Sequence, residues 1–186
     1  MTSPRLPPLR REDCTNPDQR AAVESLEKET TPTFGSPTES AFTYTNDAGA
    51  LIGPFPFFLA APDAGTHLLG IFRKLGAIPG LPPDAKETVI LTVGAHFQAP
   101  YELYAHSNVA IKRVGMPEYV VNAVARGEKP EALNEKCSLA YDAATYLVSK
   151  PGKLSDALWE KCIAAFGKEG TVALVHYVYV MPAHRV

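Results

Sequence analysis

The sequence predicts an all-α protein, a compact helical bundle of about seven or eight helices. Helix-start signals such as Asn16-Pro17 and Pro100 recur along the chain, and glycines follow the apolar stretches. Apolar residues recur at helical spacing, for example within residues 131–149. Only one β-branched run, Thr88–Val93, suggests a strand. These observations favour helices joined by short connections.

The N-terminal part is predicted to contain an extension followed by an irregular segment. Residues 1–15 are proline-bearing and expected to be extended, and Asn16-Pro17 opens a helix that is predicted to run to about Glu29. We therefore assign residues 1–30 to an N-terminal extension with a helix. Residues 31–56 mix Thr, Ser, Pro and Gly with scattered aromatic residues, which is typical of an arm or a lid.

Residues 57–186 are predicted to form the helical domain, and the chain as a whole a single globular domain. The run Thr88–Val93 is assigned to a helix because it continues to Phe97, which is long for a strand. Asp84 is its expected N-cap, with Glu87 as capping-box partner. The expected helices are Pro62 to Gly76, 84–98, Pro100 to Gly115, Pro117 to Gly127, 131–149, Ser155 to Phe166, and a strongly apolar last helix, 169–181.

Composition and charge argue against several classes of protein. The 186 residues are 46% hydrophobic and 20% charged, as in ordinary soluble proteins. A net charge of −2 without a basic block argues against a nucleic-acid partner. No apolar run reaches the roughly 18 residues of a membrane span, and no signal-peptide core opens the chain, so we expect no membrane partner and a cytoplasmic location. The three cysteines predict neither a disulfide framework nor a metal site.

The candidate chemistry lies between Glu87 and His106. Glu102 and His106 are four residues apart within one predicted helix, so they share a face. Glu87 lies near the start of the preceding helix, and an antiparallel hairpin of the two helices brings it towards the same pocket. A carboxylate beside an imidazole can act with it as general acid and base. We therefore take Glu102 and His106 as candidate catalytic residues and Glu87 as a secondary member.

Four further residues are candidates for binding a substrate. Lys86, at the start of the same predicted helix as Glu87, is the favoured cation for a substrate carboxylate, and Lys112, Arg113 and Arg73 stay open as alternatives. His96 lies on that helix and is a candidate to face the pocket, and Tyr101 and Tyr104 flank the acid-base pair. Structural interpretations stay open for all of these residues: helix capping for the carboxylates, core packing for the histidines and tyrosines.

This stretch resembles the core of the carboxymuconolactone decarboxylase and alkyl hydroperoxidase D-like superfamily. In that core an acidic residue opens one helix, a Tyr-Glu or Cys-x-x-Cys element follows with a histidine, and a Gly-hydrophobic turn comes after. The resemblance covers roughly residues 50–181 and implies an alkyl hydroperoxidase D-like helical fold. The matching elements here are Glu87, Tyr101-Glu102, His106 and Gly115-Met116.

The peroxidase branch needs cysteines at the positions of Ala99 and Glu102, so the chain resembles the decarboxylase branch. That resemblance implies a lyase or isomerase without a cofactor, which acts on a carboxylated lactone or related small metabolite by Glu/His proton transfer. It also implies a homo-oligomer, a trimer or a hexamer built from trimers. The stretch 169–181 is a further reason to expect self-association, because a helix that is apolar on nearly all sides is unusual on the surface of a small monomer. A thiol-type peroxidase or oxidoreductase and a non-catalytic helical binding protein stay open as alternatives.

Overall fold

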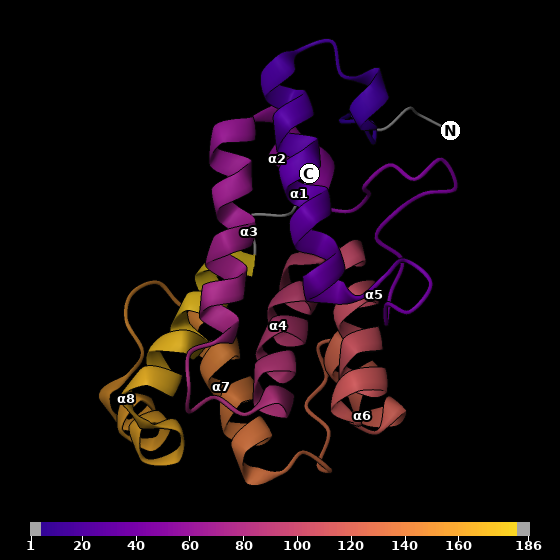
Figure 1. Ribbon diagram of the computed structural model, residues 1–186. Coiled ribbons are helices and arrows are strands. Elements are labelled where there is room, and N and C mark those ends of the chain that lie inside the picture. The colour runs from indigo at the N-terminus through magenta and orange to yellow at the C-terminus, as the bar shows by residue number, and fades with distance from the viewer. Residues whose placement is uncertain (1–4, 182–186) are drawn as a thin grey trace. The chain divides into compact units, whose positions relative to one another are not determined.

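The computed structural model describes residues 5–181 and confirms the all-α fold class. Over these residues the chain contains no strand, only one bridge between Thr45 and Leu51. No helix within them is long and apolar enough to cross a membrane. The eight α-helices are α1 (Pro17–Phe34), α2 (Phe55–Ala60), α3 (Pro62–Gly76), α4 (Pro83–Phe97), α5 (Pro100–Val109), α6 (Glu118–Ala125), α7 (Glu135–Ser149) and α8 (Asp156–Val180) (Figure 1).

The described residues fall into two compact units, an N-terminal unit that ends at Gly76 and a C-terminal unit that begins at Ala77. Each unit contains its own cluster of buried apolar side chains. The domain boundaries predicted after residues 30 and 56 stay predictions. The ends of the predicted segments, residues 1–4 and 182–186, lie outside the described part.

In the N-terminal unit, α1, α2 and α3 pack against one another. Helix α1 continues past its predicted end at Glu29 to Phe34, with Pro32 inside it. The Phe34 ring packs against Phe42, Tyr44 and Phe55, with centroids 5.3, 5.6 and 6.4 Å away. These aromatic contacts give the last turn of α1 a buried partner, which local sequence signals do not reveal.

Helix α4 is the central element of the C-terminal unit and contacts α5, α6, α7 and α8. Residues 87–94 are all buried, which explains why the run Thr88–Val93 is apolar or β-branched on every side and still helical. The predicted N-cap of α4, Asp84, was wrong. Pro82 is the N-cap and Pro83 the first helical residue, so Asp84 lies inside the first turn and Glu87 is not its capping-box partner.

Helix α8 joins the two helices that we expected at the C-terminus. Ser155 caps its start, as predicted, by accepting a hydrogen bond from the Leu158 N–H. The helix is kinked at Gly167, which has φ of +69°. A left-handed backbone angle suits glycine because it has no side chain to clash. The two predicted helices are therefore the two halves of one kinked helix.

Candidate acid-base site

A tight turn between α4 and α5 brings the predicted catalytic residues together. Gln98 adopts a left-handed conformation, with φ of +53°, and the Ala99 N–H donates to the Gly94 carbonyl over 2.9 Å. A Cβ added at Gly94 would lie 3.1 Å from the side chain of Leu103, so glycine there lets α5 pack closely against α4. Ala99 is the N-cap of α5, and Glu102 is its third residue.

The His106 ring lies between two carboxylates. Its Nδ1 is 2.7 Å from Glu87 Oε2, which is the length of a charge-assisted hydrogen bond. Its Nε2 is 3.6 Å from Glu102 Oε2, which is too long for a direct hydrogen bond. The predicted secondary member, Glu87, thus makes the direct contact, and Glu102 lies beside the opposite nitrogen.

Burial makes these charges interdependent. The Glu87 side chain is 1% exposed, that of Glu102 9% and that of His106 25%. Burial by itself lowers the pKa of His106, but the charge and hydrogen bond of Glu87 and the charge of Glu102 outweigh it and raise the pKa above its ordinary value. Charged groups in such surroundings are costly unless they are paired. The arrangement therefore favours a protonated His106 held between carboxylates.

Lys86, a predicted substrate-binding residue, contacts this cluster directly. Its Nζ lies 3.5 Å from Glu87 Oε1, and its side chain is 30% exposed. The charge of Lys86 slightly opposes the raised pKa of His106. Lys86 thus combines contact with the buried cluster and access to solvent, as a residue that binds a substrate carboxylate requires.

The other predicted substrate-binding residues lie at the edge of the cluster or away from it. His96 is exposed near the end of α4, where its ring packs edge-on against Phe97 at 4.7 Å. It lies nine positions after Glu87, about 13 Å along the helix axis. Tyr104 is 45% exposed, and its ring centroid is 6.1 Å from that of the partly buried Tyr101. Burial, and then the charge of Glu102, raises the pKa of Tyr101.

Sequence reasoning missed Tyr177 in α8. This residue is 5% exposed, and burial, with a smaller effect of the Glu87 charge, raises the pKa of its hydroxyl to about 12. Its neighbour in the sequence, His176, is exposed. The available signal was helical spacing, because Tyr177 lies four and three residues after the buried Ala173 and Leu174. Tyr177 therefore belongs to the electrostatic surroundings of Glu87.

A small cavity lies beside Glu102. Its volume is about 10 Å³, close to the minimum that holds one water molecule. Besides Glu102, the described residues that line it are apolar or glycine: Ile90, Val93, Gly94, Phe97, Ala99 and Met181. Glu102 therefore has surroundings on this side that hold little water.

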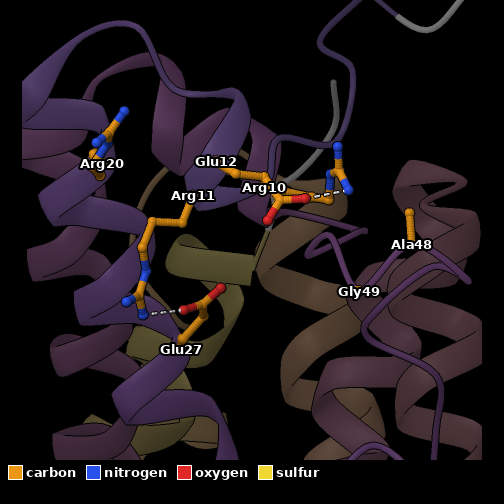
Figure 2. A pocket seen from close by; sticks show the side chains of 7 residues that line it. All are labelled: Arg10, Arg11, Glu12, Arg20, Glu27, Ala48 and Gly49. Carbon is orange, nitrogen blue, oxygen red and sulfur yellow. Dashed lines mark hydrogen bonds and ion pairs between the residues drawn. The ribbon is translucent and has the colours of Figure 1, made fainter.

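A second concave region lies in the N-terminal unit and is lined by three arginines (Figure 2). Arg10 is paired with Asp13 at 2.7 Å and with Glu12, and Arg11 is paired with Glu27 at 2.7 Å. Arg20 donates to the Cys14 carbonyl over 2.8 Å. An anion would have to compete with these carboxylates, so we assign no function to this region.

No protein-family model matches the sequence, and no curated protein matches it. The superfamily resemblance therefore rests on the sequence elements Glu87, Tyr101-Glu102, His106 and Gly115-Met116.

Proposed function

We propose that the C-terminal unit is a small-molecule lyase or isomerase that needs no cofactor and works by proton transfer on a carboxylated metabolite, such as a carboxylated lactone. The observation that supports this most strongly is the position of His106. Its two ring nitrogens face the carboxylates of Glu87 and Glu102, and both carboxylates are buried. Isomerisation needs a proton acceptor and a proton donor at one place, and decarboxylation needs a donor that protonates the carbon left by carbon dioxide.

The geometry supports a separate role for each of the three residues. Glu87 holds the Nδ1–H of His106 and thereby orients the ring and stabilises its protonated form. The Nε2 atom is then the position that gives or takes a proton. Glu102 lies on the Nε2 side, 3.6 Å away, as the second proton-transfer group. Lys86 is the candidate to hold a substrate carboxylate that is not lost in the reaction.

In a decarboxylation, the electron pair of the breaking carbon–carbon bond stays on the substrate carbon, which then accepts a proton. Protonated His106 supplies that proton from Nε2 and is reloaded from water. In an isomerisation, Glu102 removes a proton from one carbon and His106 delivers one to another. Both reactions use the same pair of groups, and the substrate decides between them.

The thiol-based alternative receives less support. Burial raises the pKa of Cys137 and of Cys162 to about 11, and burial also raises that of Cys14. The thiolate is the reactive form of cysteine, so these side chains are protonated and weakly nucleophilic near neutral pH. A non-catalytic binding role is the second candidate function, and the small volume beside Glu102 favours it.

Metabolite profiles distinguish an enzyme from a binding protein. We would compare a deletion strain with strains that express the wild-type chain, His106→Ala, or the control His67→Ala, whose histidine is exposed and lies in the other unit. The proposed substrate should accumulate in the deletion and His106→Ala strains only. A His106→Ala strain with the wild-type profile would contradict the proposal.

We also propose that the chain forms a homo-oligomer, a trimer or a hexamer built from trimers, on the strength of the resemblance. The apolar second half of α8 contributes less to this proposal than the sequence suggested, because Ala173, Leu174, Tyr177 and Val178 are buried within the chain itself. Sedimentation equilibrium at micromolar concentration tests the assembly, and a stable monomer would contradict it.

A further inference from the structure

A cavity of about 680 Å³ lies in the C-terminal unit and contains none of the acid-base residues. Its volume falls within the range of about 300–1,000 Å³ that is typical of small-molecule pockets. The lining comes from the end of α7, the connection to α8 and both halves of α8: Leu147, Gly152, Lys153, Leu154, Asp156, Trp159, Val175 and Tyr179.

The kink at Gly167 makes this cavity possible. Trp159 and Tyr179 are twenty residues apart, and a straight helix would separate them by about 30 Å. They line the same cavity because α8 changes direction between them, at the left-handed backbone of Gly167. The cavity is therefore a product of the fold of α8 and not an irregularity of surface side chains.

The lining is suited to an uncharged ligand. Leu147 and Leu154 are buried and provide apolar surface. Among the described residues, Lys153 and Asp156 are the only charged ones in the lining, and they pair with each other, with Nζ 2.7 Å from Oδ1. Both side chains are 83% exposed, so this pair lies at the solvent side of the cavity. The apolar side chains of the described lining offer an ionised group no charged partner in exchange for its hydration.

Two aromatic rings contribute the rest of the lining. Trp159 is 40% exposed and Tyr179 59% exposed, and they are two of the six large apolar side chains that are exposed among the described residues. Aromatic rings of this kind favour contact with another ring in offset or edge-on geometry, and their N–H and O–H groups can bond to a polar substituent.

We propose that this cavity binds a small, uncharged aromatic molecule. Its volume, its paired charges and its two aromatic side chains all fit that class of ligand. This site goes beyond the proposed proton-transfer function and does not depend on it.

Trp159 is the only tryptophan of the chain, so its fluorescence reports directly on the cavity. The full-length protein is titrated with para-fluoroanisole, and binding is followed by tryptophan fluorescence and by fluorine NMR of the probe. The matched anion is para-fluorobenzoate. We expect saturable binding of the neutral probe and about tenfold or more weaker binding of the anion. Absence of saturable para-fluoroanisole binding would overturn the proposal.

Variants locate the bound probe. Trp159→Ala and Tyr179→Ala should each weaken binding of para-fluoroanisole by about tenfold, whereas Trp159→Phe keeps a ring and most of the affinity. Tyr119→Ala is the control, because Tyr119 is 67% exposed and lies on α6 outside the cavity. The proposal fails if Tyr119→Ala has the same effect, or if Tyr179→Ala disrupts self-association while the wild-type chain binds no probe.

Discussion

His106 is held between two carboxylates, and these surroundings determine how it should titrate. Glu87 and Glu102 together raise its pKa despite burial. We predict that an NMR titration places the pKa of His106 above the ordinary value of about 6.5. In Glu87→Gln the pKa should fall, because the closest negative charge and the charge-assisted hydrogen bond are lost. An unchanged pKa in that variant would show that Glu87 does not stabilise the imidazolium.

The same shift predicts how stability depends on pH. A folded-state pKa above the unfolded value means that the His106–Glu87 pair contributes fully below about pH 6.5. The contribution is lost as pH rises through the raised folded-state pKa of His106. Denaturant midpoints measured from about pH 6 upward should therefore fall more in the wild type than in Glu87→Gln.

Catalysis gives a second prediction at the residue scale. General acid-base groups contribute about 10²–10⁴-fold in rate, so His106→Ala and Glu102→Gln should each lower turnover by about that factor while the fold is kept. The double variant should lose much less than the product of the two effects, because residues that act as a unit are not additive. Turnover is measured on the substrate identified from the metabolite profiles.

Cysteine variants are the matched control for this prediction. Cys137→Ala and Cys162→Ala should leave turnover nearly unchanged, because both thiols are buried away from any acid-base role. Loss of activity in these variants, together with an active His106→Ala protein, would transfer the chemistry to a thiol and favour the oxidoreductase interpretation.

The sequence predicted which residues lie near His106 but not which carboxylate makes the closest contact with its ring. Spacing of four residues on one helix indicates that Glu102 is near the ring. The spacing says nothing of ring orientation, and the ring presents Nδ1 to Glu87 on α4, nineteen residues earlier in the chain. The contribution of Tyr177 depends on how α8 packs against α4, which is tertiary information that a local pattern does not contain.

At the scale of an element, α3 offers a direct test of close packing. A Cβ added at Gly65 would lie 2.2 Å from the Phe58 carbonyl oxygen in α2, whereas a Cβ at Gly70 would meet nothing within 4 Å. Backbone atoms cannot move aside as a flexible side chain does. We predict that Gly65→Ala destabilises the protein by about 1–3 kcal/mol.

Gly70→Ala is the matched control, since it makes the same substitution in the same helix. Alanine is the better helix former, so this variant should be neutral or more stable by about 0.5–1 kcal/mol. Denaturant unfolding measures both variants. Equal effects would show that the α2–α3 contact at Gly65 is not as close as the structure places it.

Helix identities were predicted well, and helix ends less so. Proline starts and glycine stops act locally and identify both ends of α3 and the starts of α5 and α6 within one residue. The predicted end of α5 at Gly115 was wrong, because α5 ends at Val109 and a π-helical turn, Ala110–Val114, follows it. The extension of α1 to Phe34 depends on aromatic partners later in the chain. The kink of α8 likewise depends on packing, because a single glycine is compatible both with a helix end and with a bend.

At the scale of the whole molecule, the chain divides where α3 ends and residue 77 begins. Composition does not reveal this division, because both parts contain similar amphipathic and apolar helices. It follows from which helices share a buried cluster. One cluster combines residues from Cys14 to Leu69, and the other combines residues from Leu91 to Tyr141. All of the acid-base residues lie in the C-terminal unit.

This division leads to a prediction about the fragment 77–186. It contains its own apolar cluster and every group that raises the pKa of His106, so it should fold on its own and keep that raised pKa. Circular dichroism and an NMR titration of His106 measure the two properties.

The fragment 83–186 is a sharp control because it lacks Gly80. The Gly80 backbone packs against α8 so closely that an added Cβ would lie 2.3 Å from the Phe166 carbonyl oxygen. We expect the shorter fragment to unfold at lower denaturant concentration, since it loses that contact and the Pro82 carbonyl, which accepts a hydrogen bond from the Lys86 N–H in the first turn of α4. A disordered 77–186 fragment would mean that the acid-base site needs the N-terminal unit in order to form.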